Sequence, residues 1–324
     1  MSAVLAKVSK RAGLAAALLC LGLVAAEASD VTIGYSVPSM GSAFWTSATY
    51  GVEKEAEASG TKLIKVDAGS DNNVSQQIGQ IQDLIQRHVN AIIIGAANGD
   101  ALKPVAERAI AAGIPVIGFS TPPTTDKMAS YIGADHYDMG RLQAECMGKA
   151  IGGKGKVAMM SFVTGQIWAD LRAKGFKETV AKQFPGISIV AENRLATTRA
   201  ESITLTEDWI QRFPDLAGIY TTIDDMAGGV VPTLKAAKKS IVVTTSNLSP
   251  SAQKMIHDGD LPCTSIQKIV EQGRNALQQA VKAAQKEPTT KAILLPAVLV
   301  TKDNIDTVDL SSVRLLPTIG LKHV

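Results

Sequence analysis

The sequence predicts an α/β protein with two lobes of similar plan, each built on a parallel sheet that helices cover on both faces. Three observations lead to this prediction. Short apolar runs alternate with amphipathic helical segments, the spacing of these runs in the first half recurs in the second, and further elements follow at the C-terminal end. The chain of 324 residues is long enough for two domains, at about 150 residues for each domain.

Eight short runs rich in β-branched residues have the length and composition of strands. Amphipathic segments separate them. In one such segment Val74, Ile78, Ile81 and Ile85 are three or four residues apart and so share one face of a helix. Strands that alternate with helices in this way favour parallel sheets. The runs begin near Val31, Lys62, Ala91, Pro115, Lys156, Ile187, Ala217 and Ile241.

The intervals between these runs repeat along the chain. They are about 31, 29 and 24 residues in the first half and about 31, 30 and 24 residues in the second half. A single long sheet has no reason to repeat its spacing, so we expect two domains with the same order of elements. The sequence has no shorter repeat, which excludes solenoid folds.

The C-terminal part adds elements that a simple chain of two domains does not need. We expect a helix near Ser251–Asp258, a strand near Cys263–Gln267, a helix over 270–284 and a strand near Ala297–Thr301. One lobe must accept some of these elements, so the chain crosses between the lobes more than once. Such a chain forms a cleft that the carboxyl ends of parallel strands line.

The first 28 residues have the features of a secretory signal peptide. Three basic residues precede an uncharged run rich in Ala and Leu at 12–26, and small residues flank a cleavage site after Ala28. We therefore expect an exported protein from which 1–28 is removed. Removal takes three basic residues and one acidic residue out of a formal net charge of +3, which leaves about +1. A nucleic-acid-binding protein normally has a clear basic excess, so this class is excluded.

Two cysteines, Cys146 and Cys263, remain after this removal. In an oxidising compartment they can form one disulfide. The alternative is a pair of buried free thiols, and the sequence alone leaves both open.

Most residues at the ends of the predicted strands are polar and uncharged. Hydroxyl and amide groups donate and accept hydrogen bonds without bringing charge, so a cleft lined by them suits a neutral ligand rich in hydroxyl groups. The alternative is that Ser, Thr and Asn simply favour loops and helix caps. The strand-end residues are Ser36, Asp67, Ser120, Thr121, Ser161, Thr164, Thr221, Thr222, Ser246, Asn247 and Gln267.

Three aromatic residues stand at equivalent places in the two halves. Phe44 and Trp45 follow the first strand and open the first helix, and Trp168 opens the first helix of the second half. A flat ring at a cleft can stack on the apolar face of a sugar or under a cationic group. The alternative is packing of the helix on the sheet.

Two charged residues lie near these positions. Arg172 is one helical turn after Trp168 and can present a rigid fork of donors to ligand oxygens, or it can lie on a solvated helix face. Asp224 follows a strand and begins a helix, so it either accepts hydrogen bonds from ligand hydroxyl groups or caps the helix.

Catalytic and metal-binding motifs are absent from the sequence. The four histidines form no HExxH motif, and the chain has no GxSxG, CxxC or phosphate-binding GxxxxGK[ST] motif. We therefore expect no enzymatic activity, no metal and no cofactor.

From Val31 to about Thr301 the chain resembles type I periplasmic solute-binding proteins of the ribose-binding group. The resemblance implies two Rossmann-like lobes joined by three hinge crossings, comprising 29–134 plus 268–296 and 135–267 plus 297–324. It also implies a monomer that binds a sugar or polyol and delivers it to the membrane permease subunits of an ABC transporter. The segments that carry it are VTIGYSVPSMGSAFW (31–45), GIPVIGF (113–119), LRAKGF (171–176), FPDLAGIYTTIDDMA (213–227), MIHDGDLPCTSIQ (255–267) and LLPAVLVT (294–301).

The resemblance also implies a set of ligand-binding positions. Ser120 and Thr121 stand where ribose-type sites have an Asp-Arg pair, Ile223 replaces an asparagine, and Asn247 replaces an aspartate. Loss of these bidentate groups removes the usual clamp on a pyranose ring and argues against ribose itself. The matching positions are Ser42, Phe44, Trp45, Ser120, Thr121, Arg172, Thr197, Ile223, Asn247 and Gln267.

A second resemblance competes with the first. The segments AFWTSATYGVEKEAEASG (43–60), VDAGSDNN (66–73) and SVRLLPTI (312–319) are similar to the periplasmic sensor of trimethylamine N-oxide. That resemblance implies a co-receptor for a membrane histidine kinase that binds a small methylamine-like solute. Trp45 matches one aromatic residue of the sensor's binding cage, whereas His136 and Asp138 stand where the sensor has further aromatic residues. Fold alone does not separate transport from sensing.

Overall fold

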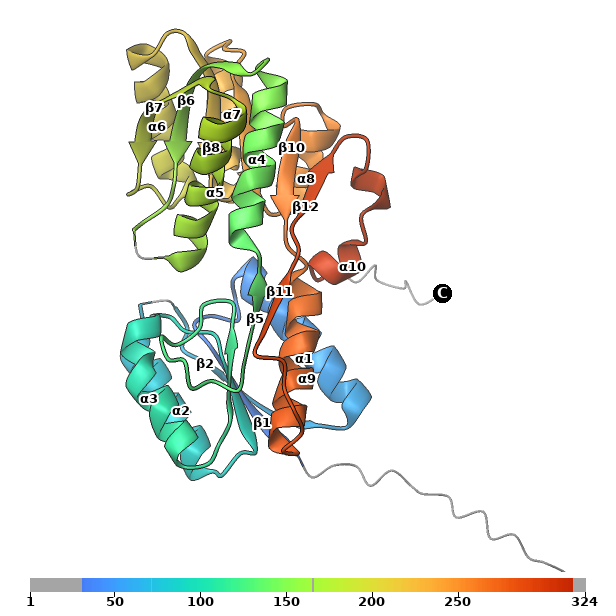
Figure 1. Ribbon diagram of the computed structural model, residues 1–324. Helices are drawn as coiled ribbons and strands as arrows, with labels where there is room; N and C mark the ends of the chain where they lie inside the picture. The colour runs from blue at the N-terminus through green and yellow to red at the C-terminus, as the bar shows by residue number, and fades with distance from the viewer. Residues whose placement is uncertain (1–30, 71, 165, 317–324) are drawn as a thin grey trace, which may run out of the picture.

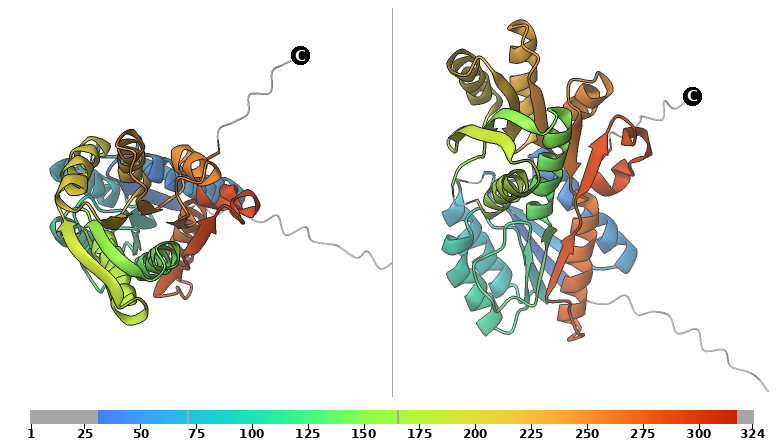
Figure 2. Two further views of the ribbon diagram at one scale, coloured as in Figure 1. Left: turned by 90° about the horizontal axis from the view of Figure 1, so that it is seen from above. Right: turned by 45° about the horizontal axis from the view of Figure 1, so that its top comes forward.

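The computed structural model describes residues 31–70, 72–164 and 166–316. The signal peptide predicted at 1–28 lies outside the described residues. The described chain forms two α/β lobes stacked end to end, each with one six-stranded sheet (Figures 1 and 2). The two-lobed α/β fold predicted from the spacing of the strands is confirmed.

The first lobe is built on a sheet with the strand order β11-β5-β4-β3-β1-β2, and all its strand pairs are parallel. Its strands are β1 (Thr32–Val37), β2 (Lys62–Asp67), β3 (Ala91–Ile94), β4 (Val116–Phe119), β5 (Ser130–Ala134) and β11 (Ala292–Leu295). One face packs on α1 (Ala43–Ser59) and α9 (Ile269–Ala284), and the other on α2 (Val74–Gln86) and α3 (Gly99–Ala111). Because both faces are covered, β3 and β4 are buried along their whole length.

The second lobe repeats this plan with the strand order β12-β10-β9-β8-β6-β7. Its strands are β6 (Lys154–Met160), β7 (Gly186–Asn193), β8 (Leu216–Thr221), β9 (Val242–Ser246), β10 (Cys263–Ile266) and β12 (Val298–Thr301). One face packs on α4 (His136–Ala150) and α5 (Ile167–Gln183), and the other on α6 (Arg199–Arg212), α7 (Asp224–Ala236) and α8 (Pro250–His257). The short η1 (Ile305–Thr307) and α10 (Leu310–Val313) follow β12.

The chain passes between the lobes at three places, which lie side by side. They are the connections from β5 to α4, from β10 to α9 and from β11 to β12. In the first lobe β11 pairs with β5, and in the second lobe β12 pairs with β10, so the connections are neighbours (Figure 1).

The predicted parallel sheets are confirmed, with one exception at an edge, where β12 is antiparallel to β10. The carboxyl end of β11 faces the other lobe, since β11 runs parallel to β5. A two-residue connection then brings the chain into the second lobe at the end nearest the first. From there β12 runs away from the junction, whereas β10 runs toward it, so the two strands are antiparallel.

Helix pairs in both lobes approach closely through glycine. In the first lobe an ideal Cβ on Gly51 of α1 would lie 2.1 Å from the carbonyl oxygen of Val270 in α9. In the second lobe a Cβ on Gly140 of α4 would lie 1.9 Å from the carbonyl oxygen of Arg172 in α5. A side chain at either position would overlap the backbone of the neighbouring helix, so these glycines allow α1 to pack closely on α9 and α4 to pack closely on α5.

Cys146 of α4 and Cys263 of β10 form a disulfide, which settles the alternative that the sequence left open. The bond joins the element that follows the first crossing to the strand that precedes the second. It therefore ties α4 to the start of β10 within the second lobe, at the end of the strand away from the crossings.

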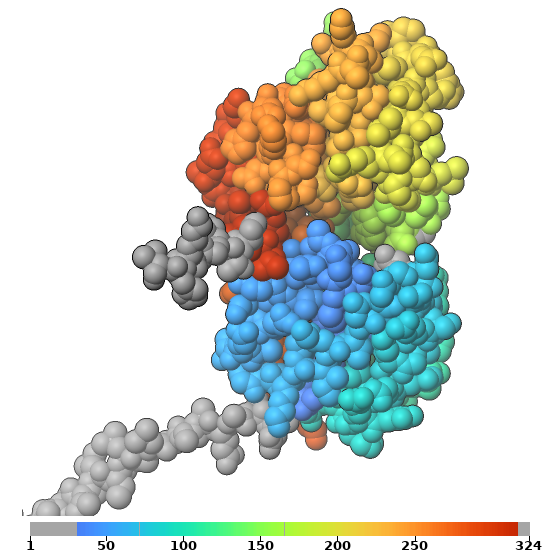
Figure 3. All heavy atoms as spheres, turned by 180° about the vertical axis from the view of Figure 1, so that it is seen from behind, coloured from blue at the N-terminus to red at the C-terminus, as the bar shows by residue number. Residues whose placement is uncertain are grey.

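The C-terminal segment of the described chain lies at the junction of the lobes (Figure 3). Arg314 donates to Gln253 of α8 at 2.6 Å, and the backbone N–H of Leu315 donates to Ser47 of α1 at 3.1 Å. This segment therefore contacts both lobes. Among the described residues, no helix has the length and apolar character that a membrane span requires.

Candidate functional site

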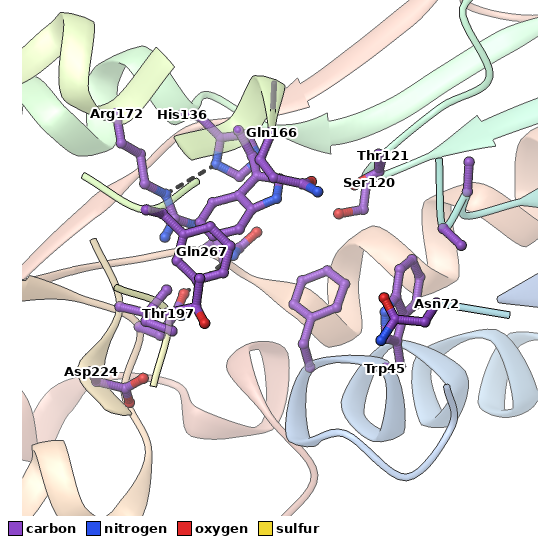
Figure 4. A pocket seen from close by; sticks show the side chains of 17 residues that line it. Trp45, Asn72, Ser120, Thr121, His136, Gln166, Arg172, Thr197, Asp224 and Gln267 are labelled. Atoms are coloured by element: carbon purple, nitrogen blue, oxygen red, sulfur yellow. Dashed lines mark hydrogen bonds between the residues drawn. The ribbon is translucent and has the colours of Figure 1, made fainter. Parts of the chain in front are cut away.

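A cavity of about 550 Å³ lies between the lobes, where the carboxyl ends of the strands in both sheets meet (Figure 4). Both lobes contribute residues to its wall, as expected for a cleft between two parallel sheets. The residues that line it are Phe44, Trp45, Asn72, Ala96, Ala97, Ser120, Thr121, His136, Phe162, Gln166, Trp168, Arg172, Thr197, Ile223, Asp224, Asn247 and Gln267.

Three residues of this wall have a left-handed backbone that L-amino acids seldom adopt. Their φ angles are 57° at Ser120, 66° at Phe162 and 74° at Asn247. Each follows a strand, at the point where the chain turns toward the next element. A non-glycine residue in this region costs on the order of 1–3 kcal/mol and such residues cluster at functional sites, so this grouping supports a binding role for the cavity.

The wall from the first lobe is aromatic. Trp45 packs edge-on against Phe44 at 5.0 Å between ring centroids and against Phe119 at 5.8 Å. Only 8% of Trp45 is exposed, and an ideal Cβ on Gly95 would lie 2.2 Å from its ring. Trp45 is therefore mostly a core residue that shows one edge to the cavity, whereas Phe44 is half-buried.

The wall from the second lobe combines aromatic rings with a buried cation. Trp168 packs against Phe162 at 4.9 Å between centroids, and the guanidinium carbon of Arg172 lies 5.1 Å from the Trp168 ring. Arg172 is 1% exposed. Its Nε donates to Nδ1 of His136 at 3.3 Å, and its Nη1 donates to the carbonyl oxygen of Thr222 at 3.0 Å. The solvated helix face considered for Arg172 is thus excluded.

Burial sets the protonation state of both Arg172 and His136, and their contact decides which nitrogen of His136 carries the proton. Burial lowers the pKa of Arg172 to about 10, so the guanidinium is charged at neutral pH. Burial and the neighbouring charge of Arg172 hold the pKa of His136 well below its usual range, so the imidazole is neutral. Because Nδ1 accepts from the guanidinium, the ring proton must be on Nε2. Nε2 is buried and has no hydrogen-bond partner among the described residues.

Asp224 is the acidic residue of the cavity wall. It begins α7 but is not the cap, because the N-cap position belongs to Ile223. Its carboxylate accepts the backbone N–H of Ser249 at 2.7 Å, and burial raises its pKa above the usual value. One oxygen of Asp224 is therefore engaged within the second lobe.

An amide chain connects the cavity to the hinge. Gln267 directly follows β10, donates to Asn247 at 3.2 Å and accepts from Gln272 of α9 at 3.2 Å. Because Gln272 belongs to the first lobe, these hydrogen bonds link the two lobes at the rim of the cavity.

The structure brings most of the predicted residues together. Phe44, Trp45, Ser120, Thr121, Trp168, Arg172, Asp224, Asn247 and Gln267 all line the cavity, as do Thr197 and Ile223. Ser42 does not line it. It is exposed and caps α1, where its hydroxyl accepts the N–H of Trp45 at 3.4 Å, so its side chain serves the start of the helix.

The sequence patterns did not predict several of the residues that line the cavity. Phe162 comes two residues after the end of β6 and is one of few aromatic residues, so its place near a strand end was a usable signal. Asn72 and Gln166 are in loops without periodicity, and nothing in the sequence marks them. Ala96 and Ala97 follow β3 and leave room in the cavity. His136 stood out only as a difference from the sensor of trimethylamine N-oxide.

The side chains of this site are those of a binding pocket. Within the described ranges, no group of three His, Cys, Asp or Glu side chains is placed to hold a metal ion. The aromatic edges, amides and hydroxyls of the wall can instead enclose a small polar molecule with apolar faces.

Known proteins of similar sequence and structure support this description. The chain is 28% identical to the ribose import binding protein of Bacillus subtilis over 84% of its own length and 88% of the relative's. It is 29% identical to the xylitol-binding protein of Mycolicibacterium smegmatis over 90% of its length and 85% of the relative's. A solved structure of an ABC transporter solute-binding protein from Bacillus halodurans with bound myo-inositol superposes with a TM-score of 0.80 at 25% identity, covering 88% of this chain and 99% of that one.

The family model described as the periplasmic binding protein domain matches residues 33–288, which span β1 to β10 and all the residues that line the cavity. The two-lobed fold, the strand order and the relatives agree with this match. The chain belongs to the periplasmic binding protein family.

Proposed function

We propose that this protein is the periplasmic binding component of an ABC importer and carries a sugar, a polyol or a close derivative between its two lobes. The observation that carries the proposal is the interlobe cavity, which has an aromatic wall from each lobe and amide and hydroxyl groups between them. Aromatic edges suit the apolar faces of a carbohydrate, and amides suit its hydroxyl groups. The relatives bind ribose, xylitol or myo-inositol by their names, which supports the same class of ligand.

Each part of the wall has a role in this proposal. Phe44 and Trp168 stack on the ligand from opposite lobes. Arg172 presents its unused N–H groups to ligand oxygens, and Asn247 and Gln267 exchange hydrogen bonds with hydroxyl groups near the hinge. Trp45 holds Phe44 in place from behind.

Closure of the lobes around the ligand is part of the proposal. The lobes comprise 29–134 plus 268–296 and 135–267 plus 297–324, with the hinge at the three crossings. The amide chain through Gln267 spans this hinge, so it can report the presence of ligand in the cavity to the joint that moves. Binding is then followed by recognition of the closed monomer by permease subunits in the membrane.

The proposed site of action is the periplasm, after cleavage of a signal peptide at Ala28. The family is typically periplasmic, and the basic and apolar pattern of 1–28 is that of an export signal. The ligand leaves unchanged, since the proposed protein binds and delivers it without a chemical step.

The comparisons favour transport over the role of a sensor for methylamines. The relatives from Bacillus subtilis and Mycolicibacterium smegmatis are binding proteins for ribose and xylitol by name. The cavity gives a physical reason as well, because the buried charge of Arg172 repels a quaternary ammonium group that would need the same aromatic wall.

A thermal-shift screen of the mature protein tests the proposal. Sugars, polyols and sugar acids form one arm, and trimethylamine N-oxide and glycine betaine form the other. A ligand at 100 times its dissociation constant adds about 2.7 kcal/mol to the free energy of unfolding, so a true ligand gives a clear shift. The ligand should also be recovered chemically unchanged. A shift with the methylamines alone would contradict the proposal and support the sensor.

A further inference from the structure

The charges around the cavity do not balance. Only three titratable side chains line it, namely Arg172, His136 and Asp224, within the part of the chain that the structure describes. At neutral pH Arg172 is charged and His136 is neutral, because burial and the neighbouring guanidinium lower the pKa of the imidazole. The remaining question is whether Asp224 neutralises Arg172.

Asp224 makes no ion pair with Arg172 among the described residues, where the guanidinium donates to His136 and to Thr222 instead. Its Oδ2 accepts the backbone N–H of Ser249. Arg314 is a second cation near this carboxylate, because burial lowers its pKa while the charge of Asp224 raises it. The single carboxylate is therefore shared between two guanidinium groups, and the cavity keeps a positive surplus at Arg172.

Donors without partners gather at the same place. Arg172 uses Nε and Nη1 for His136 and Thr222, while its Nη2 makes no hydrogen bond with any described residue. The Nε2–H of His136 is also without a partner among these residues. A buried cation and a buried donor are costly when no acceptor meets them, so both gain when a ligand supplies one.

Neither lobe offers a second acid for this role among the described residues that line the cavity. The groups that face the cavity from the end of β4 are Ser120 and Thr121, and the group after β9 is Asn247. All three are neutral. They can hydrogen-bond ligand hydroxyl groups, but they cannot neutralise a cation.

We propose that the ligand carries a carboxylate, and that this group binds against the Nη2 edge of Arg172 and the Nε2–H of His136. This inference rests on the proposed function and names its substrate class as a polyhydroxylated acid, such as an aldonic or uronic acid. The planar guanidinium fork matches a carboxylate, which can accept two parallel hydrogen bonds. The hydroxyl groups of such an acid then meet the amides and the aromatic edges of the two walls.

Matched pairs of ligands test the inference by titration calorimetry at pH 7.5 and constant ionic strength. Each pair differs only in the acid group, as in D-gluconate against D-glucitol and D-galacturonate against D-galactose. We expect the acid of at least one pair to bind at least tenfold more tightly than its neutral partner. Equal or tighter binding of the neutral members would overturn the inference and leave the proposed function intact. If no member of either class binds, the proposed function fails, and the inference fails with it.

Two variants locate the effect. Arg172→Gln removes the charge, and we expect it to abolish the preference for the acid. Arg199→Gln is the matched control, because Arg199 is an exposed arginine of the same lobe that pairs with Asp225 and does not line the cavity. Loss of the preference in both variants, or in neither, would contradict a local role for Arg172. The comparison in the wild-type protein needs no variant, so the inference can be refuted even if Arg172→Gln fails to fold.

Discussion

Arg172 and His136 form a buried pair in which Nε of the guanidinium donates to Nδ1 of the imidazole at 3.3 Å. The pair joins the first turn of α4 to α5, close to the first crossing between the lobes. It works only with a neutral histidine, because a protonated ring has no acceptor and would place a second cation beside the first. The protonation of His136 is therefore coupled to folding.

Stability should fall in mild acid because of this pair. The unfolded chain protonates His136 near pH 6.5, whereas the folded chain does so only at lower pH. Stability from this group is present above pH 6.5 and is lost as the pH falls below it, with a slope of at most about 1.4 kcal/mol per pH unit. Urea unfolding at pH 7.5, 6.5 and 5.5 measures the slope. In His136→Gln the slope should be smaller, and equal slopes would show that His136 titrates normally.

Trp45 and Trp168 should differ in what they contribute. Trp45→Ala removes a side chain that is only 8% exposed, so we expect the free energy of unfolding to fall by about 3–5 kcal/mol. Trp168→Ala should cost less stability, since the ring is half-buried, but it should weaken ligand binding by about 1–3 kcal/mol. Urea unfolding and titration calorimetry of both variants separate the two effects. A Trp45→Ala protein of normal stability and reduced affinity would reverse these assignments.

Gly140 should be irreplaceable in the packing of α4 on α5. The Cβ of Gly140→Ala would overlap the backbone of Arg172, so we expect a stability loss of at least about 1–3 kcal/mol and weaker ligand binding from a displaced guanidinium. Gly79→Ala in α2 is the matched control, because nothing lies within 4 Å of its Cβ. That variant should gain about 0.5–1 kcal/mol from helix propensity. Thermal unfolding of the two proteins compares them directly, and equal midpoints would argue against the close helix contact.

The disulfide between Cys146 and Cys263 should stabilise the second lobe. It closes a loop with a sequence separation of 117, and loss of a native disulfide typically costs about 2–5 kcal/mol. We expect Cys146→Ser/Cys263→Ser to unfold at lower urea concentration than the wild type. Dithiothreitol should bring the wild type to the same midpoint and leave the double variant unchanged. A wild type that is insensitive to full reduction would contradict this role.

The sequence was sufficient for the fold because periodicity and spacing are local properties. The predicted strand starts near Lys62 and Ala91 match those of β2 and β3, and Val31 and Pro115 are one residue from those of β1 and β4. The short strands β5 and β11 were missed. Each directly precedes a crossing between the lobes, and their four or five residues carry too little pattern to stand out.

The site was harder to predict, because a side chain at a strand end can turn either way. Ser161, Thr222 and Ser246 are fully buried, and the residues that line the cavity come one or two positions later. The hydroxyl of Thr222, for example, donates to the carbonyl oxygen of Met160 at 2.7 Å. Strand ends therefore located the cleft, but the left-handed turns at Ser120, Phe162 and Asn247 decide which residues reach it.

The central claim is that a polyhydroxylated ligand binds between the lobes, and a fluorescence titration tests it most directly. The chain has three tryptophans, and Trp209 is 2% exposed in the core of the second lobe. A Trp45→Phe/Trp209→Phe protein leaves Trp168 as the reporter on the cavity wall. We predict a saturable change in its emission on addition of a sugar, polyol or sugar acid, with the same dissociation constant that calorimetry gives for this variant. Binding by calorimetry with no change in emission would place the ligand outside the cavity and contradict the account.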